Sequence, residues 1–406
     1  MIIGIFGATQ SGHYLAQLLD KHQRVSKIYH YHTSTNDKFA RNLTKYEAVL
    51  FDNPAYIAKT IMSCDLIITM GSSSQVNERL QALFSKAPGK KLVPSKDCSM
   101  LEESKILSKA LFKKLGIRTP EYRVVEYNDL LDKFFSYARP FVLKYDQDFR
   151  AGRQTLIIRD DNVNEIFEEI KSHGRKKFNR QEVNNEFIVE DHLVGKEHSL
   201  HILADGANWC YLGSARDYKK ELDGDQGNNV TSMGCYSVVH SLSEDLKKYI
   251  NSILQHLVDS GTPYKGIMYL GILKDSENKD HILELNARPG NPEFVAVLNN
   301  IENDILDVLM SPDPGKLDIK FKQTVCLNIQ LHNTISVYNR EITQEINLVD
   351  IPEDIVVSYS ELFGMMPAAG VTTVAENLTV ASDRLYHYLD QLNLKVRFRL
   401  DIGRLL

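Results

Sequence analysis

The chain begins with short apolar runs separated by polar turns, a pattern that predicts alternating strands and helices. Residues 2–6 are apolar, a glycine-containing turn follows at 7–12, and a helical pattern then runs over 13–21. Strand, glycine turn and helix in this order open a Rossmann-like βαβ unit. The apolar run at 66–70 predicts a buried parallel strand of the same sheet. We therefore expect a Rossmann-like N-terminal domain over residues 1–119.

The end of this first domain is marked by helix and breaker signals. Ser99 can cap a helix predicted over residues 100–115, Gly116 follows that helix, and Pro120 lies just beyond it. After Pro120 the pattern changes to short strands, with an amphipathic helix at 246–258. The fold class that these signals predict is a multidomain mixture of α/β and α+β architecture.

The remainder of the chain divides into two parts by its pattern. Apolar runs at 267–273 and 281–285 flank a polar turn, which predicts a hairpin. The tail combines strand signals with one helix predicted over 381–392. We assign residues 120–320 to a central domain and residues 321–406 to a small C-terminal α+β domain.

Composition and charge narrow the class of protein. The 406 residues include 48 Lys and Arg against 53 Asp and Glu, which gives a formal net charge of −5. Proteins that wrap nucleic acid non-specifically carry the opposite balance, so no polynucleotide partner is expected. Because no apolar stretch approaches about 18 residues and the N-terminus lacks a basic leader, no membrane association is expected. Five cysteines without disulfide or zinc spacing favour reduced thiols in a cytoplasmic enzyme.

The glycine turn at 7–12 has two interpretations. It lacks the spaced G-x-G-x-x-G signature, and no acidic residue closes the second strand cleanly. One interpretation is a tight strand-to-helix turn, and the other is a helix N-terminus that faces a phosphate-bearing ligand. An NAD-dependent oxidoreductase built on this turn is therefore an alternative at this point.

A segment near residue 290 has the pattern of a metal site. Glu284 and Asn286 alternate along a predicted strand and so share one of its faces. Two adjacent oxygen ligands suit Mg²⁺, which takes its other ligands from water and nucleotide phosphates; Mn²⁺ is the alternative ion. Arg288 continues the same face, where its charge can neutralise a transferring phosphoryl group. A polar edge strand is the competing interpretation.

Two further segments combine cations with glycine. Residues 216–237 form a long polar stretch that includes Asp217 and Lys219, and a loop of this length is usually functional or disordered. Its backbone N–H groups and Lys219 can meet an anion, while a solvated loop is the alternative. Lys144 ends an apolar strand and precedes a glycine flanked by arginines, of which Arg153 is one. Such an arrangement can hold a triphosphate.

Together these segments resemble the ATP-grasp enzymes, and more narrowly the glycinamide ribonucleotide synthetases (phosphoribosylamine–glycine ligases). The resemblance covers essentially the whole chain, and its motifs occur in the family's order. They are Leu101-Glu102-x-Ser104-Lys105, Thr119-Pro120-Glu121-Tyr122, Asp217-x-Lys219-Lys220 with Asp223-x-Asp225-x-Gly227-x-Asn229, Met233-Gly234-x-Tyr236-Ser237, Tyr264-Lys265-Gly266, Glu284-Leu285-Asn286-Ala287-Arg288-x-Gly290-x-Pro292-Glu293 and Phe398-Arg399-x-Asp401-Ile402-Gly403. The fold implied is a pre-ATP-grasp domain, a central ATP-grasp domain and a small C-terminal domain.

The resemblance also implies a role for each matching position. Lys105, Lys144 and Arg153 would contact the phosphates of ATP. Glu190 would begin the adenine-binding hinge, and Glu197 would bind the ribose. The other implied sites are Glu284 and Asn286 for Mg²⁺, Asp217, Lys219 and Arg288 for catalysis, and Asp225, Gly227, Asn229 and Met233 for the acceptor substrate.

Several positions depart from the family pattern, mostly on the amine side. The family's Gly-Pro-Glu becomes Gly71-Ser72-Ser73, so a carboxylate expected near the amine substrate is missing. Its Asn-Thr-Gly-Gly-Met-Gly becomes Asn229-Val230-Thr231-Ser232-Met233-Gly234. The added side chains narrow a loop where the backbone is expected to approach the substrate. The N-terminal Gly-Gly-Arg-Glu-His becomes Thr9-Gln10-Ser11-Gly12-His13.

Three functions remain open from the sequence. One is an active ligase of purine biosynthesis that joins glycine to phosphoribosylamine. Another is a paralogous ligase that joins a different amino acid or amine in a specialised-metabolite or modified-nucleotide pathway. The third is a nucleotide-binding or regulatory protein that has lost catalysis, or an oxidoreductase built on the N-terminal turn. The retained Glu284, Asn286 and Arg288 argue against lost catalysis. We expect ATP with small carboxylate and amine substrates, and a monomer or homodimer in the cytoplasm.

Overall fold

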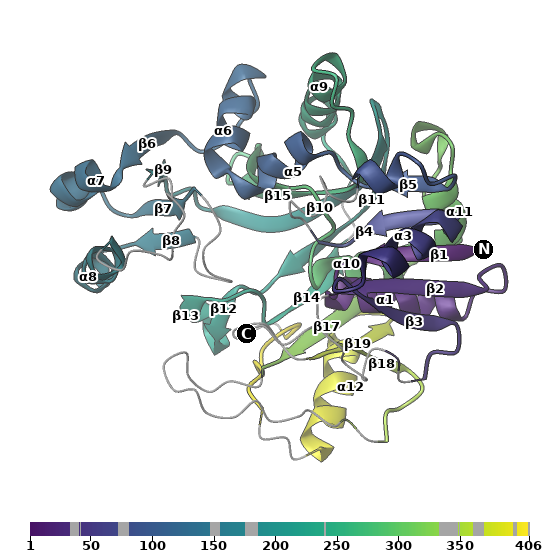
Figure 1. Ribbon diagram of the computed structural model, residues 1–406. Coiled ribbons are helices and arrows are strands. Elements are labelled where there is room, and N and C mark those ends of the chain that lie inside the picture. Colours follow the sequence, from purple (N-terminus) through teal and green to yellow (C-terminus); the bar gives the residue numbers. More distant parts are fainter. Residues whose placement is uncertain are drawn as a thin grey trace.

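The computed structural model describes residues 1–32, 40, 42–71, 81–146, 155–174, 186–238, 241–332, 348, 350–359, 369–392 and 396–404. Within these residues the chain forms three larger β-sheets and one two-stranded sheet. Figure 1 shows the N-terminal sheet and a small blue sheet on opposite sides of the molecule. Ser72, Ser73 and Arg153, which carry sequence-based expectations, lie outside the described residues.

The N-terminal part is a parallel sheet with the strand order β3-β2-β1-β4-β5. All neighbouring strands run parallel, which confirms the Rossmann-like expectation. Because the strand order reverses between β1 and β4, the carboxyl ends of these strands form the kind of crevice where open α/β sheets bind ligands. The elements are β1 (Ile2–Phe6), α1 (Gln10–Asp20), β2 (Lys27–His32), β3 (Tyr46–Leu50), α3 (Pro54–Ser63), β4 (Leu66–Thr69) and β5 (Lys90–Leu92).

The single helix predicted after Ser99 is two helices, and Ser99 lies inside the first of them. Helix α5 (Lys96–Glu103) and helix α6 (Lys105–Lys114) meet at Ser104, which ends one and caps the other. The Ser104 hydroxyl also donates a 2.8 Å hydrogen bond to the Asp146 carboxylate. The cap itself is local, because the Ser104 hydroxyl accepts from the Leu107 N–H at 3.2 Å.

A small antiparallel sheet follows with the strand order β6-β9-β7-β8. It packs with its helices around a separate apolar cluster that includes Phe134, Phe141 and Leu143. This sheet projects from the rest of the molecule in Figure 1. The elements are β6 (Tyr122–Glu126), α7 (Tyr127–Lys133), η1 (Phe134–Ser136), β7 (Phe141–Tyr145), β8 (Thr155–Ile158), α8 (Val163–Gly174) and β9 (Glu186–Asp191).

The largest sheet has eight strands in the order β16-β15-β10-β11-β14-β17-β19-β18. Strand β14 pairs with β17, so the C-terminal strands extend the central sheet. The hairpin predicted before residue 286 is confirmed as β15 and β16. The domain limits at 119/120 and 320/321 remain predictions. The strands are β10 (Gly195–Asp205), β11 (Asn208–Asp217), β14 (Gly234–Val238), β15 (Lys265–Asp275), β16 (Asp280–Asn286), β17 (Val325–Leu331), β18 (Ile355–Tyr359) and β19 (Ala369–Ala375).

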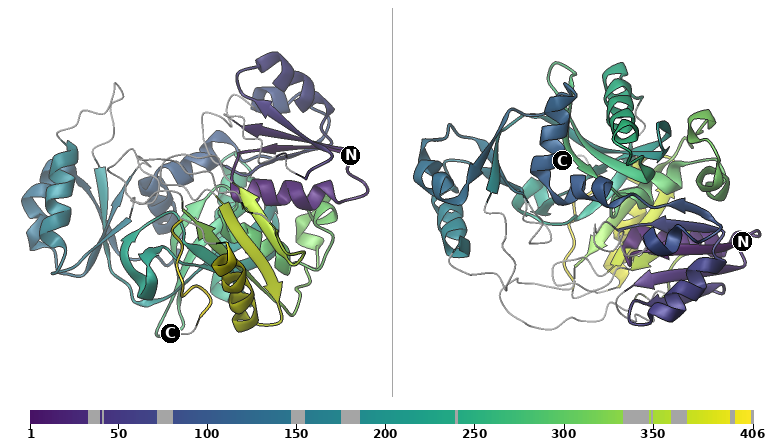
Figure 2. Two further views of the ribbon diagram at one scale, coloured as in Figure 1. Left: turned by 90° about the horizontal axis from the view of Figure 1, so that it is seen from below. Right: turned by 45° about the horizontal axis from the view of Figure 1, so that its top comes forward.

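Helices cover the large sheet and tie it to the N-terminal sheet. Helix α9 confirms the amphipathic helix predicted at 246–258 and buries Ile250 and Leu254. Helix α10 packs against both α1 and β11, so one apolar cluster runs from the N-terminal sheet into the large sheet. Figure 2 shows the small sheet lying apart from this joined core. The elements are α9 (Glu244–Asp259), α10 (Glu293–Asn300), α11 (Ile305–Met310), η3 (Pro314–Lys316) and α12 (Leu378–Gln391).

The long polar stretch at 216–237 forms strands in the described structure. Strand β12 (Lys220–Leu222) and strand β13 (Gln226–Asn229) pair as a short hairpin between β11 and β14. The turn η2 (Asp223–Asp225) joins them, with Gly224 at a φ of 69°. Glycine adopts this left-handed conformation without strain. The stretch is therefore a shaped projection of the large sheet.

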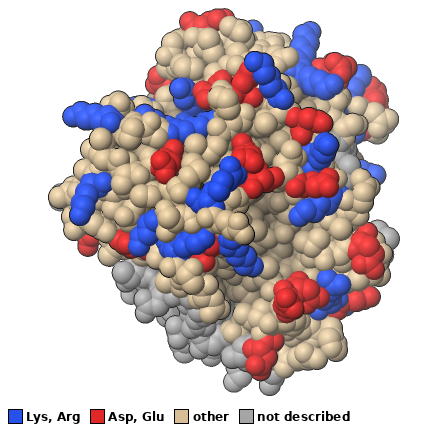
Figure 3. Space-filling view, turned by 90° about the vertical axis from the view of Figure 1, so that its right-hand side faces the viewer, with Lys and Arg blue, Asp and Glu red and all other residues tan. Residues whose placement is uncertain are grey.

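The surface and the cysteines agree with the composition. Figure 3 shows basic and acidic side chains interspersed on the face that it presents. All five cysteines are free and buried. Among the described helices, none has both the length and the apolar character needed to cross a bilayer.

Candidate active site

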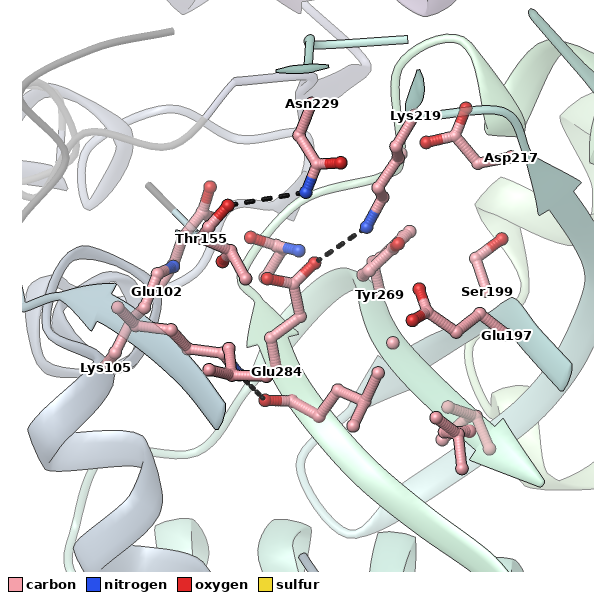
Figure 4. A pocket seen from close by; sticks show the side chains of 18 of the residues that line it. Glu102, Lys105, Thr155, Glu197, Ser199, Asp217, Lys219, Asn229, Tyr269 and Glu284 are labelled. Atoms are coloured by element: carbon pink, nitrogen blue, oxygen red, sulfur yellow. Dashed lines mark hydrogen bonds and ion pairs between the residues drawn. The ribbon is translucent and has the colours of Figure 1, made fainter. Parts of the chain in front are cut away.

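A cavity of about 760 Å³ lies between the small sheet and the large sheet. Its walls come from the α5–α6 junction, from β7, β8, β9 and β10, from the region around β12 and β13, and from β15, β16 and the segment after them. Figure 4 shows how side chains from these elements converge. The predicted site residues that line the cavity are Lys105, Lys144, Glu190, Glu197, Asp217, Lys219, Asn229, Glu284, Asn286 and Arg288.

Lys144 and Glu190 line the cavity, and Lys109 lies buried behind them. We call this charge cluster of Lys109, Lys144 and Glu190 the lysine wall. Lys109 Nζ and Lys144 Nζ each lie 2.8 Å from a different carboxylate oxygen of Glu190. Burial would raise the pKa of Glu190, but the two lysines hold it below its usual value. Burial and the charge of Lys144 lower the pKa of Lys109 to about 8. Two ammonium groups against one carboxylate suit this wall to a polyphosphate.

Lys105 joins this wall from the first turn of α6. Its backbone N–H donates to the carbonyl oxygen of Asp146 at 3.2 Å. The neighbouring Ile106 N–H donates to the Asp146 carboxylate at 2.8 Å. Asp146 is 3% exposed and so ties the start of α6 firmly to the end of β7. These bonds bring Lys105 close enough for its charge to act on Glu284.

Strand β16 presents the predicted metal ligands to the cavity. Glu284 and Asn286 both line it, and Lys219 Nζ lies 3.8 Å from Glu284 Oε1, as Figure 4 shows. Burial would raise the pKa of Glu284, but the charges of Lys219 and Lys105 help to lower it to about 2. Glu284 is therefore an ionised carboxylate at neutral pH.

The donor set on β16 fits a hard divalent cation that arrives with a nucleotide. No cluster of three or more His, Cys, Asp or Glu side chains that could hold a metal occurs in the described part of the chain. Mg²⁺ needs no such cluster, because it keeps several waters and takes further ligands from phosphates. An ionised carboxylate at Glu284 and an amide oxygen at Asn286 supply the one or two protein ligands typical of such sites.

Arg288 is held in place by Glu102, a residue to which the sequence reasoning assigned no role. Arg288 Nε donates to Glu102 Oε1 at 2.9 Å, and Glu102 Oε2 accepts from the Ala287 N–H, also at 2.9 Å. Burial would lower the pKa of Arg288, but the charge of Glu102 helps to hold it above its usual value. Glu102 thus fixes both the backbone at Ala287 and the direction of the guanidinium.

Another part of the cavity contains two carboxylates, the half-buried Asp217 and the buried Glu293, and we call it the carboxylate end. Asp217 ends β11 and Glu293 begins α10, and both line the cavity. Burial raises the pKa of Asp217, and the charge of Glu293 raises it further. Burial also raises the pKa of Glu293. The Ser232 hydroxyl donates a 2.6 Å hydrogen bond to Asp217 Oδ1. This end attracts positive charge, in contrast to the lysine wall.

Of the residues between 225 and 233 that were predicted to contact the acceptor substrate, only some line the cavity. Asn229, at the end of β13, lines the cavity. Its Nδ2 donates to the carbonyl oxygen of Thr155, at the start of β8, at 3.3 Å, as Figure 4 shows. Asp225 and Gly227 lie outside the described lining. Met233 is buried in the apolar cluster of the C-terminal strands. Substrate contacts at these last three positions remain predictions.

The C-terminal motif around Arg399 packs against the β12–β13 hairpin and holds its shape. Arg399 is 2% exposed and pairs with Asp401 at 2.7 Å and with Asp225 at 2.8 Å. It also donates to the Lys220 carbonyl oxygen at 3.0 Å. The Gly224 N–H donates to Asp401 at 2.9 Å. Asp225 is therefore part of the scaffold that shapes the hairpin.

The glycine turn after β1 packs against the segment that follows β16. The Ser11 N–H donates to Asn291 Oδ1 at 3.1 Å, and the Ser11 hydroxyl donates to the Gly290 carbonyl oxygen at 2.7 Å. The Gly290 N–H donates to His201 Nε2 at 3.0 Å. A Cβ atom at Gly290 would lie 2.9 Å from that nitrogen and 3.0 Å from Glu293 Oε2. In the described structure the turn thus makes a tight packing contact, as its first interpretation has it.

Three residues of this site received no role from the sequence: Lys109, Glu102 and Glu293. Lys109 follows Lys105 by four residues on α6, and helical spacing already places the two on one face. Glu102 meets Arg288 across 186 residues, and no local pattern predicts such a contact. Glu293 stood at the end of a recognised motif, but its burial beside Asp217 depends on how α10 packs.

Residues 103–294 match the family model described as phosphoribosylglycinamide synthetase, ATP-grasp (A) domain. Among curated proteins, the phosphoribosylamine–glycine ligase of Leptospira interrogans is 31% identical over 235 residues, which is 55% of this chain and 53% of the relative. The chain thus spans about half the length of this curated relative in the match. The family match lies C-terminal to the glycine turn at 7–12.

Solved structures extend the likeness to the whole fold. The crystal structure of phosphoribosylamine–glycine ligase from Thermotoga maritima has a TM-score of 0.76 at 23% identity, covering 99% of this chain and 100% of that one. N5-carboxyaminoimidazole synthetase from Staphylococcus aureus, complexed with ADP, has a TM-score of 0.63 at 15% identity over 95% of this chain and 96% of that one. At these identities the likeness establishes the fold.

Proposed function

We propose that this protein, an ATP-grasp superfamily member that resembles the phosphoribosylamine–glycine ligases, uses ATP to join a carboxylate to an amine. The carboxylate would be activated as an acyl phosphate, with release of ADP and then phosphate. The observation that carries the proposal is one cavity that combines the lysine wall, the Glu284–Asn286 pair and the carboxylate end. A polyphosphate, a divalent cation and an amine each find complementary groups there.

Nucleotide binding rests on the lysine wall and the strands beside it. Lys144 and Lys105 line the cavity, and we assign them to the phosphate oxygens. Glu190 begins the hinge segment at which the adenine would bind, and Glu197 of β10 faces the cavity for the ribose hydroxyls. Arg153 remains a predicted phosphate contact outside the described residues. A cation held by Glu284 and Asn286, Mg²⁺ or Mn²⁺, would supply charge neutralisation of the bound phosphates.

In the first chemical step a carboxylate oxygen attacks the γ-phosphorus of ATP, and ADP leaves. Phosphoryl transfer requires little covalent participation from the protein, because positioning and charge stabilisation provide most of the catalysis. Arg288, fixed by Glu102 at 2.9 Å, offsets charge on the equatorial oxygens of the transferring group. Lys219 is held between Glu284 and Asp217, where it can contact the phosphoryl oxygens as they move.

In the second step the neutral amine attacks the acyl carbon, phosphate leaves with the bonding electron pair, the nitrogen loses a proton to the leaving phosphate or to solvent, and the amide forms. The acyl phosphate is also open to attack by water, so water has to be excluded. The contact between Asn229 and the Thr155 carbonyl oxygen brings the hairpin against the small sheet at the mouth of the cavity. This contact supports a closed arrangement in which an acyl phosphate would survive until the amine reacts.

The finer assignment is the purine-type reaction of glycine with phosphoribosylamine, or the same chemistry on another amino acid or amine. The second candidate is favoured by Ser232, which stands where the family pattern has glycine and whose hydroxyl donates a hydrogen bond to Asp217 at 2.6 Å. Steady-state kinetics with glycine, ATP and freshly generated phosphoribosylamine separate the two. A kcat/KM of about 10⁴ M⁻¹s⁻¹ or more establishes the purine-type reaction.

The same assay tests the broader proposal. ADP release that depends only on another amino acid or amine supports the paralogous ligase. Absence of ADP release with every carboxylate and amine in a broad panel contradicts a ligase of either kind. We propose small-molecule partners, a monomer or homodimer, and action in the cytoplasm as for a biosynthetic enzyme.

A further inference from the structure

Lys109 is the member of the lysine wall that lies behind the cavity surface. Its side chain is 1% exposed, whereas Lys144 and Glu190 line the cavity. A buried ammonium group costs free energy unless it is paired, and the reaction steps proposed above give Lys109 no contact with a substrate. Its position indicates a role that acts through a neighbouring side chain.

Lys109 is held by contacts with several elements. Its Nζ lies 2.8 Å from Glu190 Oε1 on β9 and donates to the Thr119 hydroxyl just before β6. That hydroxyl donates in turn to the Ile282 carbonyl oxygen on β16 at 2.7 Å. The Nζ also lies 5.9 Å from the centre of the Tyr122 ring. These contacts fix the ammonium group of Lys109 against one oxygen of Glu190.

Lys144 contacts the other oxygen of Glu190 and faces the cavity. Its Nζ lies 2.8 Å from Glu190 Oε2 and donates to the Leu283 carbonyl oxygen at 3.3 Å. An ammonium group has three N–H donors, and in the described structure these two contacts leave one donor for a ligand. Lys144 can therefore contact a phosphate oxygen while it remains paired with Glu190.

The charge of this cluster depends on Lys109. Two ammonium groups and one ionised carboxylate give the lysine wall a net charge of +1. Without Lys109, the remaining pair of Lys144 and Glu190 would be neutral, and Glu190 Oε1 would lose its cationic partner. A buried carboxylate oxygen without a partner is costly, so Lys144 would be drawn across both oxygens. The positive charge and the donor that face the cavity would then be lost to the phosphate.

On the basis of the proposed function and its nucleotide site, we propose that Lys109 is a positioning residue that keeps Lys144 available for a phosphate of the nucleotide. Lys109 occupies one oxygen of Glu190, and this confines Lys144 to the other oxygen. Lys109 also supplies the positive charge that Glu190 would otherwise remove from the phosphate site. It acts on the nucleotide only through Glu190 and Lys144.

Binding of Mg²⁺–ADP, measured by isothermal titration calorimetry at pH 7, tests this role without any carboxylate or amine substrate. Burial and the charge of Lys144 lower the pKa of Lys109 to about 8, so Lys109 is protonated in this measurement. Lys109→Met changes the charge of the cluster from +1 to 0. The Kd for Mg²⁺–ADP should rise about tenfold, the scale for loss of one unit charge several ångströms from a phosphate at a partly buried site. An unchanged Kd overturns the inference.

A second substitution separates charge balance from packing. Glu190→Gln in the Lys109→Met background returns the charge of the cluster to +1, and it should recover most of the lost affinity for Mg²⁺–ADP. If Lys109 served packing alone, the double variant would bind as weakly as Lys109→Met or more weakly, and that result overturns the inference. Glu190→Gln by itself should bind Mg²⁺–ADP at least as tightly as the native protein. If Lys109→Met does not fold, weaker binding by Glu190→Gln overturns the inference and equal or tighter binding supports it.

Lys113→Met is the matched control, because Lys113 lies four residues later on α6 and is exposed. The same loss of charge there should leave the Kd for Mg²⁺–ADP unchanged, and a rise equal to that of Lys109→Met overturns the inference. Turnover separates this inference from the proposed function. Absence of ADP release with every carboxylate and amine contradicts the ligase, while binding of Mg²⁺–ADP still decides the role of Lys109. A native protein that does not bind Mg²⁺–ADP overturns both.

Discussion

The lysine wall and the carboxylate end differ in how their charges are balanced. At the lysine wall, Lys109 and Lys144 share Glu190 through two 2.8 Å contacts, and the carboxylate is held ionised. At the carboxylate end, Asp217 is half-buried and Glu293 is buried, and loss of solvent raises the pKa values of both carboxyl groups. The first region therefore keeps a surplus of positive charge, and the second keeps a surplus of acceptors.

This difference indicates the charge of the ligand that each region would bind. A buried charge without compensation costs free energy, so each region is stabilised by a ligand of opposite charge. The lysine wall is complemented by phosphates, and the carboxylate end by an ammonium group. Glu284, Lys219 and Arg288 lie between the two regions, where the phosphoryl group would be transferred. In the proposed reaction, phosphoryl transfer would therefore take place between these two regions.

The largest effect is expected from the residue between the two regions. Glu284→Ala should lower kcat by about 10²–10³-fold, on the scale of roughly 2.7–4 kcal/mol for loss of one charge-stabilising group. Asn286→Ala should have a smaller effect, because an amide oxygen carries less charge. ADP release is the measurement, and Glu277→Ala, at the exposed turn of the same hairpin, is the control. Near-native turnover by Glu284→Ala at saturating Mg²⁺ would remove the metal assignment.

The polyphosphate side of the comparison is tested at Lys144. Lys144→Ala should raise the KM for ATP about tenfold or more, since hydrogen bonds to charged groups contribute roughly 1.5–3 kcal/mol. Cys235→Ser is the control, because Cys235 is buried in the strand after the hairpin and lies outside the cavity lining. Steady-state kinetics in ATP provide the measurement. Equal changes in the two variants would argue against a triphosphate site at the lysine wall.

The positioning of Arg288 predicts an effect of intermediate size. Glu102→Gln removes the charge that pairs with Arg288 and keeps the length of the side chain. We expect kcat to fall several-fold with little change in the KM for ATP, because Arg288 is assigned to the transferring group. Glu168→Gln, on the outer helix α8, should have no effect. A change confined to the KM for ATP would place Arg288 in ground-state nucleotide binding instead.

A further prediction concerns stability at high pH. Lys109 has a pKa lowered to about 8 in the folded protein, against about 10.4 in an unfolded chain. Between these values the unfolded chain binds more protons, so the contribution of Lys109 to stability rises with pH. Below about pH 8 both forms are protonated, and the contribution is constant.

Urea unfolding of the native protein and of Lys109→Met measures this contribution. The difference in unfolding free energy should shift in favour of the native protein between about pH 8 and 10. One proton sets the upper limit of the slope, at about 1.4 kcal/mol per pH unit. A difference that stays level across this range would show that Lys109 keeps its proton beside Glu190.

The sequence by itself determined the local arrangements of this protein. Period two along β16 placed Glu284 and Asn286 on one face, and the apolar runs with a glycine turn predicted the N-terminal parallel sheet. Ordered motifs identified the ATP-grasp region that the family match then confirmed at residues 103–294. These features follow from the backbone geometry of strands and helices, which a short stretch of sequence already specifies.

Only the tertiary structure decided which of these residues meet. Three contacts join distant parts of the chain. Glu102 pairs with Arg288, Ser104 at the break between α5 and α6 bonds to Asp146, and Arg399 anchors Asp225. A side chain's partner across such distances is set by how sheets and helices pack, and no local periodicity encodes it. Ser232 is a further example. The sequence showed only that serine replaces a glycine of the family pattern, whereas the hydrogen bond from its hydroxyl to Asp217 depends on packing.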